Sequence, residues 1–177
     1  METSKRFGRL LIEHIPALRR YALGLSRDRA AADDLVQDCL EHALRRMDAL
    51  RSEERIASWL RSILFNLFIT GHRTSSRRGK TLDAEVLDHM ADATPQPDLR
   101  QEVNEILRAM SELTPLYRQV LVLVAVEGLS YRETAEELGV PVGTVMSRLA
   151  RARDQLRETL ATQPEHGLSP AQRGTAR

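Results

Sequence analysis

The chain has 177 residues, 42% of them hydrophobic and 29% charged, and its 26 basic and 25 acidic side chains nearly cancel. This length suits one ordinary domain or two small ones, and the apolar content argues against a wholly disordered chain. Aromatic residues make up only 4% of the chain. Leu, Ala, Val and Ile must therefore build the core, which favours helices over a β-sandwich.

The sequence offers little chemistry of its own. Cys39 is the single cysteine, which excludes an internal disulfide and a Cys-pair zinc site, and the five histidines lack metal-ligand spacing. It contains no phosphate-binding glycine loop, nucleophile elbow or paired-carboxylate signature. No apolar run approaches the ~20 residues of a membrane-spanning helix, and the charged start does not resemble a signal peptide. We expect a soluble cytoplasmic protein that is not an enzyme and needs no metal or cofactor.

Residues 7–75 are predicted to be helical throughout. Apolar residues over 7–18 recur at helical spacing, and Pro16 indicates a kink or a boundary there. Residues 30–47 carry a broad apolar stripe that predicts a second helix. Cys39 lies within that stripe, which fits a small core residue better than a redox sensor.

A third helix follows the polar break at 51–55 and is predicted to end near Gly71. Phe65 and Phe68 fall at helical spacing, which favours a place in the core. Trp59 is assigned to packing for the same reason.

Residues 76–100 change in character, with glycine, prolines and several acids, and we read them as a flexible linker with a short helical turn around 82–90. A second helical block covers 101–160. The remainder, 161–177, is expected to be a disordered tail. The predicted fold is all-α: an N-terminal helical bundle over 7–75 and a C-terminal helix-turn-helix domain.

The second block begins its central helix at Thr114, the predicted cap, followed by Pro115 at the first helical position. Residues 120–126 are apolar on every side, which predicts a buried helix that Gly128 ends. Their β-branched content would also suit a buried strand, but no partner strand is visible.

Residues 130–141 show the pattern of a helix-turn-helix. Ser130 and Glu133 have capping-box spacing, and Gly139 suits the positive φ of the turn before Pro141. In the next helix Val145, Leu149, Ala152 and Leu156 form one buried stripe. The opposite side carries polar and basic residues that can donate to phosphates and base edges, which favours DNA binding over a purely structural hairpin.

Four stretches together resemble the bacterial extracytoplasmic-function sigma factors, the two-domain promoter-specificity subunits of RNA polymerase. They are DDLVQDCLEHAL at 33–44, SWLRSILFNLF at 58–68, LTPLYRQVLVL at 113–123 and GLSYRETAEELGVPVGTVMSRLARAR at 128–153. Their order and the short linker extend the resemblance over nearly all of residues 7–160. The resemblance implies three binding surfaces.

The first surface is an acidic ridge that would dock on the β′ clamp helices of core RNA polymerase, while the C-terminal domain meets the β flap. Acidic and amide groups complement a basic partner, although the same pattern suits an ordinary solvated helix face. The ridge consists of Asp33, Asp34, Gln37, Asp38 and Glu41.

The second surface would open and read the −10 element. The resemblance places Asn66 near a flipped base, whose edge its amide can bind. The loop 48–56 would wall the base pocket, and basic side chains would hold phosphates. Thr70 stands where an Asp is common in the family, so the details of −10 recognition are open. The full set of −10 residues is Arg51, Ser52, Arg55, Arg61, Asn66, His72 and Arg73.

The third surface would read the −35 element in the major groove. Members of the family often carry Arg at the position of Met146 and a larger side chain at that of Ala150, so here these two sites offer only apolar contacts, for instance to a thymine methyl. The −35 set is Thr144, Met146, Ser147, Arg148, Ala150 and Arg151.

The resemblance therefore predicts a sigma factor for stress-response promoters, monomeric when free, whose partners are core RNA polymerase, promoter DNA and an anti-sigma factor. One alternative is a homodimeric helix-turn-helix repressor or activator that binds a palindrome without polymerase. Another is a sigma-like decoy that binds an anti-sigma protein and never engages promoters. A decoy should lose the basic recognition face, whereas this chain keeps Ser147, Arg148 and Arg151.

Overall fold

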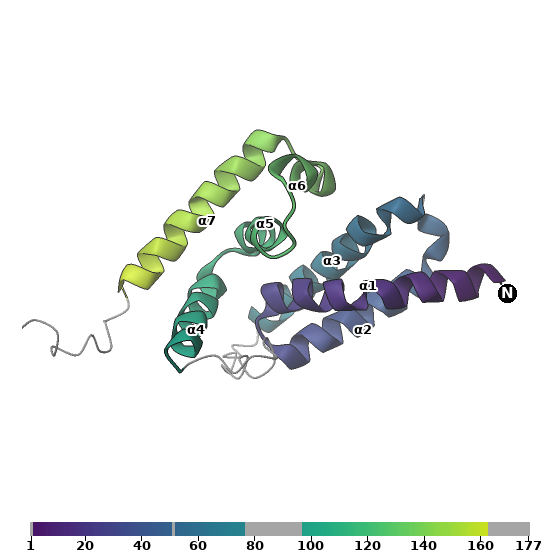
Figure 1. Ribbon diagram of the computed structural model, residues 1–177, viewed down its shortest axis with the longest axis horizontal. Coiled ribbons are helices and arrows are strands. Elements are labelled where there is room, and N and C mark those ends of the chain that lie inside the picture. The colour runs from purple at the N-terminus through teal and green to yellow at the C-terminus, as the bar shows by residue number, and fades with distance from the viewer. Residues whose placement is uncertain (1, 51, 77–96, 163–177) are drawn as a thin grey trace, which may run out of the picture.

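A computed structural model describes residues 2–50, 52–76 and 97–162, and within these ranges every regular element is a helix (Figure 1). The all-α prediction is confirmed. The elements are α1 (Glu2–Ser26), α2 (Arg29–Arg45), the 3-10 turns η1 (Met47–Ala49) and η2 (Glu53–Arg55), α3 (Ile56–Ser76), α4 (Pro97–Glu112), α5 (Pro115–Ala125), α6 (Tyr131–Leu138) and α7 (Val142–Thr162).

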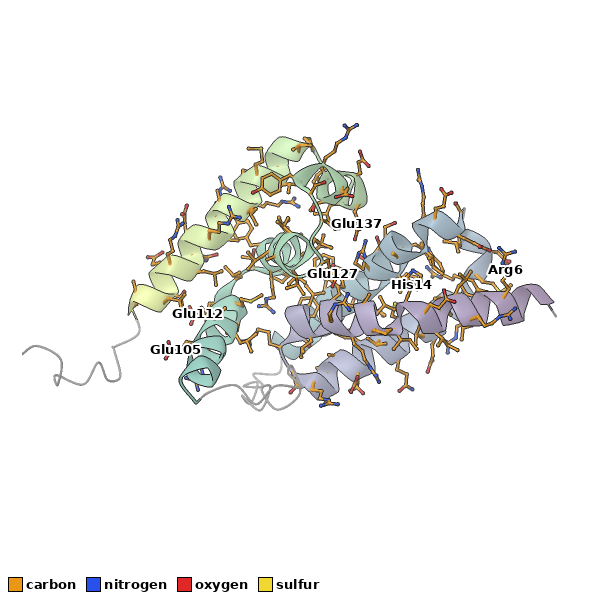
Figure 2. All side chains as sticks on the ribbon, viewed as in Figure 1. Arg6, His14, Glu105, Glu112, Glu127 and Glu137 are labelled. Carbon is orange, nitrogen blue, oxygen red and sulfur yellow. The ribbon has the colours of Figure 1, made fainter. Side chains whose placement is uncertain are left out.

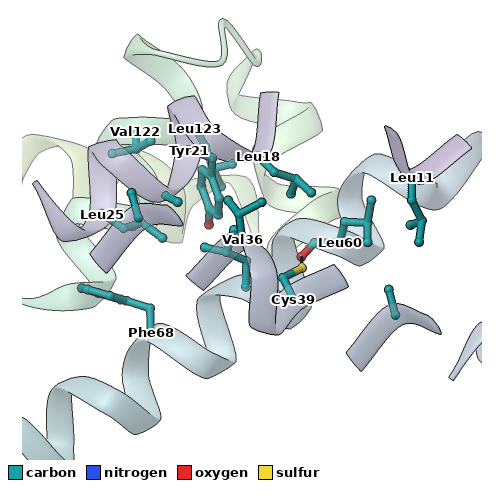
Figure 3. Packing of buried hydrophobic residues seen from close by; sticks show 14 of the residues in the cluster. Leu11, Leu18, Tyr21, Leu25, Val36, Cys39, Leu60, Phe68, Val122 and Leu123 are labelled. Atoms are coloured by element: carbon teal, nitrogen blue, oxygen red, sulfur yellow. Dashed lines mark hydrogen bonds between the residues drawn. The ribbon is translucent and has the colours of Figure 1, made fainter. Parts of the chain in front are cut away.

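Helices α1, α2 and α3 form the N-terminal unit, in which each helix contacts the other two. Leu18, Val36 and Leu60 are among the side chains buried between them (Figure 3). Cys39 is fully buried, and its thiol donates a hydrogen bond to the Leu60 carbonyl over 3.3 Å. Phe68 is buried as well, so the assignment of both residues to the core is confirmed.

Of the kink or boundary predicted at Pro16, the boundary is absent, and the helix end predicted near Gly71 is wrong. Helix α1 continues through Pro16, which faces solvent, because only the bond to the Ile12 carbonyl is lost and that carbonyl lies on an exposed turn. Helix α3 continues past Gly71 to Ser76. A single glycine costs only about 1 kcal/mol relative to alanine inside a helix, which neighbouring turns tolerate.

The C-terminal unit contains α4 to α7, with α5 in the middle of the molecule (Figure 1). The helix predicted over 120–126 is confirmed to Ala125, but Ala125 and Val126 are exposed rather than buried. Thr114 occupies the cap position, yet its side chain makes no capping bond. Its carbonyl accepts the first helical bonds instead, from the N–H groups of Tyr117 and Arg118.

The C-terminal boundaries differ slightly from expectation. Helix α4 begins at Pro97, inside the predicted linker 76–100, because proline is well suited to a first helical position. Helix α7 extends to Thr162, two residues into the predicted tail 161–177. The turn expected at 82–90 and the rest of the tail lie outside the described residues.

Helix α5 joins the two units because its opposite faces enter two different cores. Val120 packs with Ala135, Val145 and Leu149 in the C-terminal unit. Val122 and Leu123 instead belong to the N-terminal core, where Figure 3 shows them near Tyr21 and Leu25. The approach of α1 to α5 is close: a Cβ added at Gly24 would lie 2.9 Å from Cγ1 of Val122. In this structure the two units are packed against each other.

Candidate nucleic-acid interface

In the helix-turn-helix, a reciprocal cap begins α6 and a glycine turn ends it. The Ser130 hydroxyl accepts from the Glu133 N–H at 3.2 Å, and the Glu133 carboxylate accepts from the Ser130 N–H at 2.8 Å. Hydrogen bonds with Ser130 also hold the pKa of the Glu133 carboxyl below its usual range. Gly139 ends α6 with φ of 63°, in the left-handed region that favours glycine. The predicted capping box and glycine turn are both confirmed.

Helix α7 buries one stripe and presents the other. Val145, Leu149 and Ala152 are buried as predicted, and Leu156 is half-buried. The six predicted −35 residues lie away from that stripe. Met146, Ser147, Ala150 and Arg151 are exposed, with Met146 retaining 53% of its surface, whereas Thr144 and Arg148 are half-buried.

Neighbouring groups orient the polar members of this face. The Ser147 hydroxyl donates to the Thr144 carbonyl at 3.1 Å, and the Arg151 guanidinium donates to the Tyr117 hydroxyl at 3.5 Å. Arg151 remains exposed, so it can leave this weak contact for a phosphate or a base edge. The face can therefore offer polar, cationic and apolar contacts to a major groove.

The predicted −10 residues are less uniformly placed. Arg55 and Asn66 are exposed and Ser52 is half-buried. Arg51 lies outside the described residues, and of His72 and Arg73 only their place in α3 is described. Thr70 donates its hydroxyl to the Asn66 carbonyl at 2.8 Å.

Arg61 is turned toward the C-terminal unit rather than toward solvent. Its Nε donates to Glu137 Oε1 of α6 at 2.6 Å, and its Nη2 donates to Oε2 of the same carboxylate. The two side chains keep 13% and 8% of their surface, and Figure 2 shows Glu137 on the side of α6 that faces α3. The sequence analysis assigned no role to Glu137. A helical projection could have indicated that Glu137 lies toward the inner side of α6, because Glu137 follows the buried Thr134 by three residues and precedes Leu138.

A second set of polar contacts across the units was also missed. Arg118 of α5 is 3% exposed, and its guanidinium donates to the carbonyls of Leu25 at 2.6 Å and Leu113 at 3.1 Å. It also lies over the Phe68 ring, 5.7 Å from the centroid. Burial lowers the pKa of Arg118 to about 10. Sequence gives no warning of this placement, since arginine is almost never fully buried.

The predicted acidic ridge is exposed along α2. Asp33 accepts from Arg19 Nε at 3.1 Å and Glu41 from Arg45 Nη2 at 3.2 Å, and both pairs are on the surface. None of the side-chain hydrogen bonds or ion pairs among the described residues involves Asp34, Gln37 or Asp38. Exposed pairs are weak, so the whole ridge is available to a basic partner.

Among the residues that the structure describes, no group of three or more His, Cys, Asp or Glu could hold a metal ion. None of the described helices is long and apolar enough to cross a membrane.

Both units match known families. Residues 104–156 match the family described as "Sigma-70, region 4", which contains the helix-turn-helix. Residues 11–69 match the family described as "Sigma2 domain of PhyR". The two matches fall on the two helical units and leave the connection between them unmatched.

Whole-chain relatives agree with these matches. The chain is 32% identical over 160 residues to the ECF RNA polymerase sigma factor EcfG of Rhodopseudomonas palustris, covering 90% of this chain and 88% of the relative. It is 34% identical to the ECF RNA polymerase sigma factor SigM of Mycobacterium tuberculosis, covering 87% and 76% of the two chains. The sigma factor RpoE of Bartonella quintana, solved in complex with the anti-sigma factor NepR, superimposes with a TM-score of 0.71 at 30% identity, covering 90% of this chain and 99% of that chain.

The fold and its helix-turn-helix thus define a two-unit sigma subunit. The chain belongs to the family of extracytoplasmic-function (ECF) RNA polymerase sigma factors.

Proposed function

We propose that this sigma factor reads the −35 element with the outer face of α7 and the −10 element with the loop 48–56 and the exposed side of α3. The observation that carries the proposal is the two-sided structure of α7. Val145, Leu149 and Ala152 are fixed in the core, so Ser147 and Arg151 are held outward on a rigid helix. Rigid presentation of donors is what base recognition in the major groove requires.

The same proposal assigns the acidic ridge of α2 to the β′ clamp helices of core RNA polymerase and the C-terminal unit to the β flap. The support is the exposure of all five ridge residues. Polymerase then supplies the chemistry and this chain supplies promoter specificity, at promoters that respond to stress. Such a protein works in the cytoplasm, where polymerase and DNA are.

An anti-sigma factor is the expected regulator. The support is that the sigma factor RpoE of Bartonella quintana was solved with the anti-sigma factor NepR and shares 30% identity with this chain. A protein that covers the ridge or the α7 face would block transcription without touching polymerase.

The decoy reading has one observation in its favour, because residues 11–69 match a domain named for PhyR rather than for a polymerase subunit. The intact α7 face opposes it, since a decoy has no use for Ser147 and Arg151 on the surface.

Run-off transcription decides between these readings. Core RNA polymerase is incubated with a genomic fragment library, with and without the protein. Discrete new transcripts that share a two-part upstream motif are the expected result. If no transcripts form, and the protein instead restores the activity of another sigma factor that an anti-sigma factor has inhibited, the decoy reading replaces the proposal. Tight binding of the protein alone to a palindrome would indicate the homodimeric repressor.

A further inference from the structure

The packed arrangement of the two units does not fit the spacing of the two promoter elements. Positions −35 and −10 are about 25 base pairs apart, or roughly 85 Å along straight B-DNA. Helix α7, at 21 residues, is only about 32 Å long. Because Arg61 of α3 directly contacts Glu137 of α6, the two reading surfaces are held much closer together than their targets. If the proposed function is right, on which this inference rests, the units must separate on the promoter.

The contact that prevents separation also occupies a DNA-binding group. The Glu137 carboxylate engages Nε and Nη2 of Arg61 in a two-pronged pair. A carboxylate and a phosphate present similar oxygen pairs to a guanidinium. Arg61 is expected to bind a promoter phosphate. In this structure the Glu137 carboxylate occupies the place of that phosphate.

We propose that Glu137 and Arg61 form an intramolecular latch. In the free protein Glu137 holds the C-terminal unit on the N-terminal unit and neutralises Arg61. When polymerase and promoter engage, a phosphate replaces Glu137 on Arg61 and the units separate. Glu137 thus regulates promoter access without being part of the recognition face of α7.

Other contacts at the same interface support closure. Arg118 bonds the Leu25 carbonyl, and Gln119 Nε2 donates to the Tyr21 hydroxyl at 3.4 Å. Gly24 allows α1 to approach Val122. The interface therefore includes contacts between α1 and α5 as well as the ion pair between α3 and α6.

One group at the interface favours opening. Glu127 keeps only 5% of its side-chain surface, and its Oε1 has no hydrogen-bond partner although Arg20 Nε lies 3.8 Å away. A buried carboxylate oxygen without a hydrogen bond is costly, and opening would hydrate it. Closure is therefore favoured by the Arg61–Glu137 pair and by the contacts between α1 and α5, and it is opposed by the buried Glu127 oxygen that has no hydrogen bond.

The latch can be measured on the full-length protein by the distance between two spin labels. Ser62→Cys on α3 and Arg132→Cys on α6 provide exposed labelling sites near the Arg61–Glu137 contact, one in each unit, while Cys39 is fully buried. The free protein should give one short, narrow distance distribution. Glu137→Arg should raise the separated population about tenfold or more, because two buried cations would then face each other.

Matched variants identify the cause. Glu136→Arg lies on the same helix but is exposed, so it should leave the distances unchanged. Arg61→Glu combined with Glu137→Arg should restore the short distance, which a general loss of packing would not do. Gly24→Ala should also open the units by pushing against Val122, whereas Gly8→Ala, with no atom within 4 Å, should not.

Two results would overturn the latch: a free wild-type protein that already shows the long, broad distribution, or a Glu137→Arg variant that stays closed. Transcription is scored separately. If the wild-type protein shows the long distances and still produces transcripts, the latch is refuted and the proposed function as a sigma factor stands. Short distances without any transcripts would refute the proposed function alone.

Discussion

Arg118 is a buried arginine that donates hydrogen bonds to carbonyls of both units. Its guanidinium bonds the carbonyls of Leu25, Ser111 and Leu113 and has no acidic partner among the described contacts. Arg118→Ala should leave buried carbonyls unpaired and lower the free energy of unfolding by about 3 kcal/mol. Urea denaturation measures this change in the free energy of unfolding. Arg108→Ala, on the exposed side of α4, should change it by less than about 0.5 kcal/mol.

Cys39 should be chemically silent in the folded protein. Burial raises the pKa of its thiol to about 12, so almost no thiolate exists at pH 8. A thiol reagent should react only as fast as the protein unfolds, and an added Ser62→Cys, which is exposed, should react at once.

The same shift has a consequence for alkaline stability. Because the folded-state pKa lies above the unfolded value of about 8.5, its contribution to stability is complete below that pH and decreases as the pH rises toward about 12. Urea titrations of wild type and Cys39→Ala between pH 8 and 10.5 should converge. A gap that stays constant over this range would contradict the assignment.

A substitution of Arg151 tests whether this side chain recognises a base of the −35 element. Arg151→Ala should weaken binding of the polymerase complex by about 1–3 kcal/mol at promoters with the preferred −35 base, and hardly at others, if the side chain reads a base edge. Arg153→Ala is the control, since this exposed residue lies two positions along α7, on a different side of the helix. Equal losses on every promoter would show that Arg151 holds only a phosphate.

At the scale of elements, the N-terminus of α6 is stabilised by its cap. The helix has eight residues and begins with the Ser130–Glu133 box. Ser130→Ala should cost about 1 kcal/mol in unfolding free energy and weaken −35 binding, because α6 positions α7. The control is Ser62→Ala, whose hydroxyl only bonds the Ser58 carbonyl within α3. Equal effects of the two changes on unfolding would show that the cap contributes nothing special.

Local signals made these elements predictable. The capping box, the Gly139 turn and the buried stripe of α7 depend on residues within one or two helical turns, so sequence spacing contains them. The structure has neither a helix boundary at Pro16, which was one of two predicted alternatives, nor the predicted helix end near Gly71, and the reason is the opposite one. Whether a helix survives a proline or glycine depends on the packing of its other residues, and their neighbours are remote in sequence.

At the scale of the whole molecule, the contact between the units was beyond sequence reasoning. Arg61 and Glu137 are 76 positions apart, and Leu25 and Arg118 are 93 apart. No periodicity spans such distances, and each charged residue alone has the pattern of a solvated surface. The sequence therefore predicted the buried stripe of α7, but it did not predict that Arg61 is covered by Glu137 in the closed molecule.

Because α5 contributes to both cores, the two units should unfold together. Trp59 is the single tryptophan and reports on the N-terminal unit, whereas far-ultraviolet circular dichroism reports on all helices. The two signals should give the same urea midpoint for the wild-type chain. Glu137→Arg should separate them, while Glu136→Arg should not. Separate midpoints in the wild type would show that the units are independent.

The double role of α5 has a further consequence for the life of the protein in a cell. Once the units part, Val122 and Leu123 lose their cover, together with Tyr21 and Leu25 on α1. An open molecule that has found no polymerase then displays an apolar stripe, the kind of surface that chaperones and proteases recognise. Copies that are not bound to polymerase are protected from degradation while the two units stay closed. The abundance of this protein should therefore depend on the fraction of open molecules as well as on its rate of synthesis.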